Sequence, residues 1–233
     1  MHPQKTTGLL FILGALGVFI PYTVLTATFD YPDILRQEVG SILTKFREGG
    51  NSLIFTWWLF GILGLPMLVA YQQLGRRLSA RYPAASWLTT IGIIGLVAQM
   101  IGLLRWTFVV PILADNYHAG DAAAKAIAKA LFEVVHQYGG VILGEHLGQL
   151  FTITWVVGIT RLLQLSRLAP TWINWLGYAS AAIYLMAQAE LFATVIPAFP
   201  VWDPAGFIGS TLWLIWLVSL GVAWLRPHSR AAA

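Results

Sequence analysis

Residues 131–155 read LFEVVHQYGGVILGEHLGQLFTITW, and this stretch decides the fold class of the chain. It is long and apolar enough to cross a membrane as a helix, yet it contains Glu133, His136, Glu145 and His146. An ionisable side chain at the centre of a membrane helix costs about 2.5–3.5 kcal/mol. Such residues are kept where they pair, line a wet cavity or take part in chemistry. The stretch therefore predicts a membrane-spanning helix that forms one wall of a polar site.

The composition of the whole chain favours a helical membrane protein. Hydrophobic residues make up 58% of the chain and charged residues 10%, whereas about a quarter of the residues of a soluble domain are charged. The apolar runs are long and lack the short alternating segments of a β-barrel, so we expect an all-α fold. The chain has no cysteine, which excludes disulfides, thiolate metal sites and cysteine nucleophiles. Its basic residues flank apolar runs and form no patch with exposed aromatic residues, so nucleic acid is not an expected partner.

Six apolar runs are each long enough to cross roughly 30 Å of hydrocarbon as a helix. They cover Gly8–Ala27, Leu53–Tyr71, Trp87–Ile112, Leu131–Thr160, Trp172–Ile196 and Gly206–Trp224. No repeat or linker divides them. We therefore expect a six-transmembrane-helix bundle that forms one membrane domain over residues 1–233.

Basic residues predict the orientation of this bundle. The segments on one side of the membrane contain no Asp or Glu, and their basic residues are Lys5, Arg76, Arg77, Arg81, Arg161, Arg167, Arg226 and Arg230. Loops rich in Lys and Arg stay in the cytoplasm during insertion. We therefore expect both termini to be cytoplasmic, with all ten acidic residues in outer loops or within spans.

The outer connection between the first and second spans predicts an amphipathic helix. Asp30-Tyr31-Pro32-Asp33 combines a capping residue, a proline suited to a first helical turn and an acid at the positive end of a helix. Apolar residues then recur at helical spacing at Leu35, Val39, Ile42, Leu43 and Phe46, and Gly49-Gly50 ends the pattern. We expect this helix to lie on the outer membrane surface or to cap the bundle.

Two further patterns concern the ends of the spans. Residues 122–140, AAAKAIAKALFEVVHQYGG, predict that the fourth span continues outward as a protruding helix. Tryptophans near the span ends are interpreted as interfacial anchors; they are Trp57, Trp58, Trp87, Trp106, Trp155, Trp172, Trp175 and Trp224.

The polar residues of three spans are predicted to meet at one depth. Counting 1.5 Å per residue from the cytoplasmic ends puts Arg105 and Glu190 roughly 27 Å up their spans. The same count puts Glu145 and His146 roughly 23 Å up the fourth span. Arg105 is always charged and needs carboxylate partners in a membrane. We therefore expect Arg105, Glu145, His146 and Glu190 to form a polar pocket that opens outward.

The fourth span is expected to present two useful faces. Gly140, Gly144 and Gly148 recur every four residues, a spacing that lets a neighbouring helix backbone approach closely. Tyr138, Glu145 and Gln149 share another face of an α-helix, so Tyr138 and Gln149 join the predicted ligand-binding residues. Glu133 and His136 are expected to lie apart from this pocket, at the wet outer end of the span.

His136 and His146 are weak candidates for metal or haem ligands. Ten residues separate them, which is about 15 Å along an α-helix, so they cannot bind one metal ion without a kink. No other span contains a histidine, so a bis-histidine haem would need a partner chain. The phosphate-binding, dinucleotide-binding, zinc-protease and serine-hydrolase motifs are absent from the sequence, and no cofactor is identified.

Three segments resemble a bacterial membrane protein family, the domain-of-unknown-function family numbered 4386. They are FDYPDILRQEVGSILTKFREGG with Trp57-Trp58 soon after it, HQYGGVILGEHLGQLFTITW in the fourth span, and RLAPTWINWLGYASAAIYL later in the chain. The resemblance implies a multi-pass protein of the bacterial cytoplasmic membrane. It implies no catalytic residue.

Three hypotheses for function follow from these residues. The leading one is binding of a small molecule or lipid-like amphiphile in the outward-facing pocket, with Arg105 holding an anionic group. The second is an outer-leaflet enzyme in which Glu145 and His146 act as acid and base. The third is an accessory or haem-binding subunit of a membrane complex or homo-oligomer. The residues leave open whether the protein is an enzyme.

Overall fold

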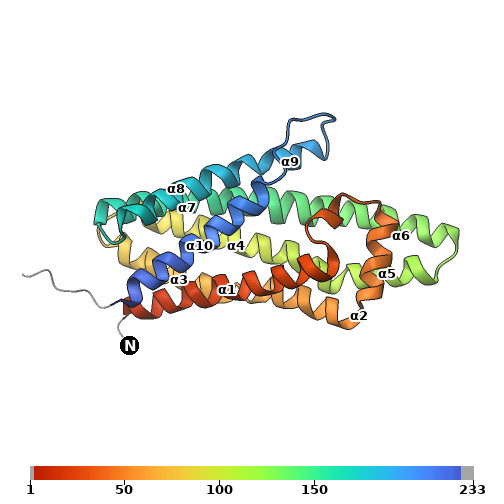
Figure 1. Ribbon diagram of the computed structural model, residues 1–233, viewed down its shortest axis with the longest axis horizontal. Coiled ribbons are helices and arrows are strands. Elements are labelled where there is room, and N and C mark those ends of the chain that lie inside the picture. Colours follow the sequence, from red (N-terminus) through yellow and green to blue (C-terminus); the bar gives the residue numbers. More distant parts are fainter. Residues whose placement is uncertain (1–2, 227–233) are drawn as a thin grey trace, which may run out of the picture. The chain divides into compact units, whose positions relative to one another are not determined.

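The computed structural model describes residues 3–226, and this part of the chain consists of helices joined by turns, without a β-strand (Figure 1). The helices are α1 (Pro3–Phe29), η1 (Asp33–Arg36), α2 (Val39–Ile62), α3 (Leu65–Ser79), α4 (Ala84–Phe108), α5 (Val110–Ala119), α6 (Ala122–Val135), η2 (His136–Leu147), α7 (Gly148–Ser166), α8 (Thr171–Met186), α9 (Gln188–Ala193) and α10 (Ala205–Leu225). Arg230, one of the basic residues used for orientation, lies outside the described residues.

Five helical stretches within residues 3–226 are long and apolar enough to cross a membrane. They are Gln4–Phe29, Val39–Ser79, Ala84–Ala119, Ala122–Ser166 and Ala205–Leu225. The expectation of an all-α, multi-pass membrane protein is therefore confirmed. The predicted span Trp172–Ile196 is not one of the five, because a turn at Ala187 divides it into α8 of 16 residues and α9 of 6 residues.

The chain folds into two compact units, each assembled from separate segments. Within residues 3–226, unit 1 contains residues 3–16, 65–94 and 150–226, and unit 2 contains residues 17–64 and 95–149. Most of the ionisable residues of the predicted pocket belong to unit 2, and Glu190 belongs to unit 1.

In unit 2, the predicted amphipathic helix is the first half of α2. Its apolar residues Ile42, Leu43 and Phe46 are buried. The helix begins at Val39, so the prediction that the helix starts at Asp30–Asp33 is wrong. Asp33–Arg36 form a single 3-10 turn, and the Glu38 side chain caps the helix by accepting the Ser41 N–H.

Gly50 separates the two halves of α2. Its φ of 56° and ψ of −153° fall in a region that only glycine adopts readily, which confirms the predicted end of the amphipathic helix. Before Gly50 the helix runs across α5 and α6, and after Gly50 the chain turns sharply (Figure 1). We call residues Val39–Gly49 the transverse helix.

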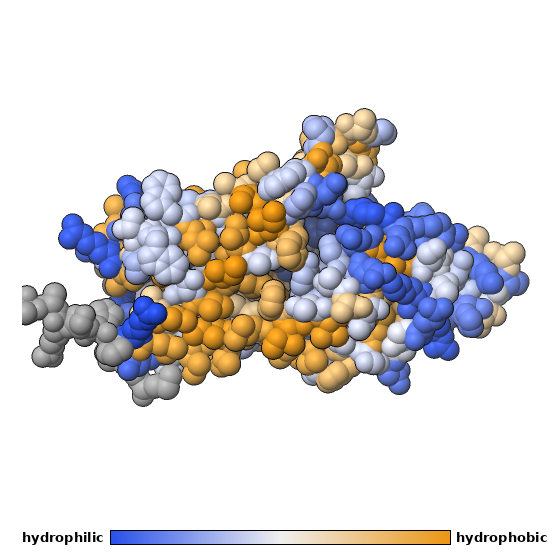
Figure 2. Space-filling model, in the orientation of Figure 1, coloured by the Kyte–Doolittle hydropathy of each residue, from blue (hydrophilic) through white to orange (hydrophobic). Residues whose placement is uncertain are grey.

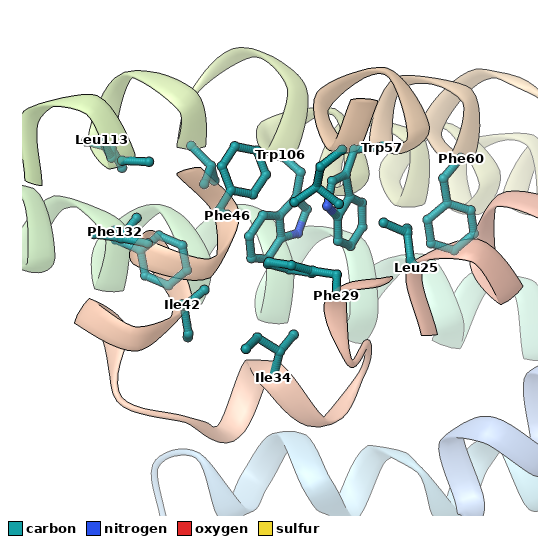
Figure 3. Packing of buried hydrophobic residues seen from close by; sticks show 14 residues of the cluster. Leu25, Phe29, Ile34, Ile42, Phe46, Trp57, Phe60, Trp106, Leu113 and Phe132 are labelled. Atoms are coloured by element: carbon teal, nitrogen blue, oxygen red, sulfur yellow. The ribbon is translucent and has the colours of Figure 1, made fainter. Parts of the chain in front are cut away.

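The transverse helix covers the hydrophobic core of unit 2 (Figure 3). At the centre of this core, Trp57 stacks on Trp106 with ring centroids 4.7 Å apart, and Phe29 meets Trp106 edge-to-face at 5.5 Å. Phe46 of the transverse helix lies 5.7 Å from Trp106. Each such aromatic side chain buries a large apolar area, so this core supplies much of the stability of the unit.

Ion pairs hold the transverse helix to its neighbours on the polar side. Arg47 pairs with Asp115 of α5 at 2.9 Å, Lys129 of α6 pairs with Glu38, and Lys45 pairs with Asp30. All of these groups are partly exposed. Hydrophilic residues gather over this end of unit 2 (Figure 2).

The core of unit 1 is also aromatic. Tyr71 of α3 stacks on Trp155 of α7 with centroids 3.5 Å apart, and Trp155 meets Trp216 of α10 edge-to-face at 5.6 Å. α8 packs along α10, where Gly209 lies against the backbone of Tyr184.

The interpretation of the tryptophans as interfacial anchors is wrong for several of them. Trp57, Trp106, Trp155 and Trp224 are at most 3% exposed, because they fill the helix interfaces of the two units. Trp87, Trp172 and Trp175 are exposed, as anchors would be.

Candidate functional site

The site begins with an unusual backbone. Residues His136–Leu147 form a π-helix between α6 and α7, so the helix is continuous from Ala122 to Ser166 but changes its winding in the middle. π-Helical segments are rare in proteins, and those that do occur are frequently found at functional sites. The α-helical spacing used to assign faces to Tyr138, Glu145 and Gln149 therefore does not hold within this segment.

Glycines bring η2 against α4 with almost no space between the backbones. A methyl group on Gly102 of α4 would lie 2.8 Å from both the Gly139 carbonyl oxygen and the Gly144 Cα. A methyl group on Gly148 would lie 2.6 Å from the Gln99 side chain. The predicted role of Gly144 and Gly148 in close helix approach is confirmed.

Gly140 has a different role from the other two glycines. A Cβ there would lie 2.4 Å from Arg105 Nη2, so the missing side chain makes room for the guanidinium. Across the turn, a Cβ on Gly139 would lie no closer than 3.6 Å to Arg105.

Arg105 is the one charged side chain that is buried among residues 3–226, with 9% of its surface exposed. Its Nη1 donates to the Gly102 carbonyl oxygen, and its Nη2 lies 3.3 Å from His136 Nδ1. The guanidinium also lies beside the Trp106 ring, 5.4 Å from the centroid. These hydrogen bonds use two of the five N–H donors of the guanidinium.

His136 contacts Arg105, so the prediction that it lies apart at the wet outer end is wrong. The count of residues along the fourth span ignored the reach of the arginine side chain. Because a guanidinium only donates, Nδ1 of His136 must accept, which leaves the proton of a neutral ring on Nε2. The ring stacks on Phe132 at 5.5 Å, and this contact fixes its orientation.

Glu145 is the acidic residue whose charge acts most strongly on Arg105. Its side chain is half-buried, as are those of His146 and Gln149, and all three take part in further polar interactions. Tyr138 is 69% exposed on the surface of η2. The structure thus brings Glu145 into electrostatic contact with Arg105.

Glu190 lies in α9 of unit 1, where its side chain is half-buried near the start of α10. Its carboxylate is 3.8 Å from the Cβ position of Gly206. A meeting of Glu190 with Arg105 stays a prediction.

Within residues 3–226, no three His, Asp or Glu side chains are placed to hold a metal ion together. Around Arg105 the structure combines a buried guanidinium, the His136 imidazole and a backbone carbonyl oxygen. The contact between His136 and Arg105 was not predicted from the sequence, because the two residues were expected at different depths.

Unit 2 also has a shallow apolar groove of about 450 Å³ on its surface. It is lined by Asn51, Ile54, Phe55, Trp58, Thr107 and Phe108. These residues come from α2 and from the end of α4, the helix that carries Arg105.

The family model described as "Domain of unknown function (DUF4386)" matches residues 6–221. The chain belongs to this family. No curated protein and no solved structure matches the chain. Membership in DUF4386 agrees with the multi-pass architecture and leaves the function to be argued from the site itself.

Proposed function

We propose that this DUF4386 protein is a six-span protein of a bacterial cytoplasmic membrane that binds a small anionic amphiphile at Arg105. In this arrangement α8 and α9 together form the additional span, both termini are cytoplasmic, and the transverse helix lies at the outer surface. Arg105 holds the anionic group, and Glu145 and His146 lie beside it as hydrogen-bonding and proton-exchanging groups.

The observation that carries the proposal is the environment of Arg105. A buried arginine is stable when carboxylates or other acceptors satisfy it. Here the hydrogen-bond partners of Arg105 are the Gly102 carbonyl oxygen and the neutral His136 ring, both uncharged. The planar guanidinium has further N–H donors. Their geometry matches a carboxylate or phosphate, which a guanidinium can bind through two parallel hydrogen bonds.

Two features favour an amphiphile over a small soluble anion. The helices that carry Arg105 and His136 belong to stretches long and apolar enough to lie in a bilayer. The groove of unit 2 has apolar walls and suits an alkyl or isoprenoid chain. A molecule with an anionic head and an apolar tail satisfies both.

The test compares oleate with oleyl alcohol, which has the same chain and no charge. We expect oleate to raise the melting temperature of the purified protein and oleyl alcohol to leave it unchanged. A ligand present at 100 times its Kd stabilises by about 2.7 kcal/mol. The shift should vanish in Arg105→Gln, and, should that variant fold poorly, in Gly140→Ala, where the new methyl displaces the guanidinium.

Glu145→Gln is the informative companion variant. Removing a negative charge near Arg105 should tighten oleate binding, by roughly tenfold if the lost repulsion is about 1.4 kcal/mol. Equal shifts with oleate and oleyl alcohol, or a full oleate shift in Arg105→Gln, would contradict the proposal and leave Arg105 as a structural partner of Glu145.

A further inference from the structure

The hairpin of α7 and α8 in unit 1 carries a polar cluster on its surface (Figure 1). Arg161 Nη1 donates to the Gln164 side-chain oxygen at 3.1 Å, one turn further along α7. The Tyr178 hydroxyl of α8 donates to the same oxygen at 3.4 Å. Trp175, one turn before Tyr178, meets the tyrosine ring edge-to-face with centroids 6.3 Å apart. We call these four residues the Arg161 cluster.

The turn of the hairpin fixes the two helices that carry the cluster. The Leu168 N–H donates to the Leu163 carbonyl oxygen at 3.1 Å, and the Arg167 N–H donates to the Gln164 carbonyl oxygen at 3.2 Å. Trp224 of α10 donates to the Leu168 carbonyl oxygen at 2.9 Å. The cluster is therefore held in place by the fold of unit 1.

The Arg161 cluster borders a surface that lipid covers. α7 is part of the stretch Ala122–Ser166, which is long and apolar enough to cross a membrane. Val157 and Leu165 lie one turn before and one turn after Arg161 on the same face of α7, and they are 42% and 44% exposed. An arginine on such a face lays its apolar stem along the helix and extends its charge to the headgroup level of the bilayer.

Positive charge at this end of unit 1 is not balanced by acidic residues. The start of α1 lies against α3, where the Thr7 hydroxyl donates to the Gln73 side-chain oxygen at 2.7 Å. The acidic residues of unit 1 within residues 3–226, Glu190 and Asp203, lie in α9 and in the connection that follows it. The basic residues are exposed and form no ion pair within the described part of the chain; they are Lys5, Arg76, Arg77, Arg81, Arg161, Arg167 and Arg226. Basic residues beside membrane helices attract anionic lipid headgroups.

The chemistry of the cluster fits the phosphate of such a headgroup. Gln164 accepts one of the five N–H groups of Arg161, and the other donors suit two phosphate oxygens. Exposed tryptophan and tyrosine rings suit the headgroup level of the bilayer. Neither α7 nor α8 contains Asp or Glu, so the hairpin has no carboxylate for the ammonium group of a zwitterionic lipid. The cluster therefore favours a lipid with a net negative charge.

We propose that the Arg161 cluster binds the phosphate of an anionic phospholipid in the membrane leaflet on the basic side of the protein. In the six-span topology this is the cytoplasmic leaflet. Gln164 orients the guanidinium, Tyr178 holds Gln164 from the neighbouring helix, and an acyl chain packs along Val157. The site belongs to unit 1 and is independent of anion binding at Arg105.

Native mass spectrometry of the full-length protein in detergent tests the site with three probes. They are dioleoylphosphatidylglycerol, dioleoylphosphatidylcholine and glycerol phosphate, which has a phosphate but no acyl chain. We expect wild type to bind phosphatidylglycerol roughly tenfold more tightly than phosphatidylcholine, because a charge-assisted hydrogen bond contributes about this factor. Glycerol phosphate should not displace the lipid.

Arg161→Gln should lose the preference for phosphatidylglycerol. Arg77→Gln is the matched control, because Arg77 has the same charge and is also exposed but makes no side-chain hydrogen bond within residues 3–226. Equal losses in the two variants, or a preference that survives in Arg161→Gln, would overturn the proposal in favour of general charge at this end. Equal binding of the two lipids, or displacement by glycerol phosphate, would overturn it as well.

Two further variants test the geometry of the cluster with the charge retained. Gln164→Leu frees the guanidinium from its partner, and Arg161→Lys replaces the planar fork with a point charge. Both should weaken phosphatidylglycerol binding severalfold and leave the melting temperature without lipid unchanged, because both side chains are exposed. Wild-type lipid binding in both variants would contradict a built phosphate site.

Discussion

At the scale of single residues, Arg105 connects the polar contacts of unit 2 with its aromatic core. Its burial requires acceptors, and the Gly102 carbonyl and His136 supply them. It also requires space, and Gly140 supplies that. The guanidinium lies beside Trp106, which links the polar site directly to the aromatic core. The arginine at this position is therefore part of the packing of unit 2.

The two neighbouring glycines give a matched test of this fit. We expect Gly140→Ala to lower the free energy of unfolding by about 1–3 kcal/mol, the usual cost of overpacking, because its methyl would overlap Arg105 Nη2. Gly139→Ala should be neutral or stabilising by up to about 1 kcal/mol, since its nearest neighbour is 3.6 Å away and alanine favours helices. Thermal unfolding of both variants measures the difference, and similar losses in the two would contradict the described packing.

At the scale of elements, the π-helix and the transverse helix are the two features that shape unit 2. The π-helix places Gly139, Gly140 and Gly144 against α4 and Arg105. The transverse helix covers the core beside Arg105, because Phe46 contacts Trp106. Both elements depend on glycines at defined positions.

Gly50 lets us test the backbone of α2 alone. Its Cβ position has no atom within 4 Å, so Gly50→Ala causes no clash and any loss comes from the positive φ. We expect Gly50→Ala to destabilise the protein by about 1–3 kcal/mol. Chemical denaturation measures this loss. An unchanged midpoint would mean that α2 continues straight through Gly50.

The ion pair between Glu38 and Lys129, which holds the start of the transverse helix to α6, should depend on pH. The Lys129 ammonium and backbone N–H groups lower the pKa of the Glu38 carboxyl below its ordinary value. The charged form is thus favoured in the folded state, so its contribution is present above the ordinary pKa and is lost as the pH falls through the lowered pKa. The protection factors of the Val39–Gly49 amides, which compare the observed exchange rates with the intrinsic rates at the same pH, should therefore fall in acid.

Two glutamine variants control for general acid effects on the transverse helix. Glu38→Gln should exchange faster already at neutral pH and lose most of the acid response. Glu48→Gln, on the same helix, should behave as wild type. If the pH dependence persists in Glu38→Gln, it comes from a titrating group other than Glu38.

Sequence patterns predicted the elements better than their contacts. The apolar runs identified five of the spans, and the stripe from Leu35 to Phe46 identified the transverse helix, because burial of one face imposes the helical period. The start at Val39 was missed because the Glu38 cap competes with Asp30–Asp33. The contact of His136 with Arg105 was missed because residue counts give depth along an axis, not side-chain reach or π-helical winding.

At the scale of the whole molecule, the number of spans decides which residues share one side of the membrane. Six spans put the α9–α10 connection outside and both termini inside. Five spans, with α8 and α9 lying along the cytoplasmic surface, put that connection inside. The basic residues of the inner segments favour six.

Single cysteines distinguish these topologies. Asp203→Cys, in the α9–α10 connection, should react with an impermeant maleimide in intact cells as readily as Ala119→Cys, and Arg167→Cys should react only after lysis. Protection of Asp203→Cys in intact cells would show that α8 and α9 do not cross.

The most direct test of the account is native mass spectrometry of the protein released from its own membranes, without added ligand. We predict an additional mass on wild type and Gly139→Ala that dissociates as an anionic amphiphile and is lost in Gly140→Ala and Arg105→Gln. The same bound species in all four proteins, or none in wild type, would contradict the claim that Arg105 binds an anionic amphiphile.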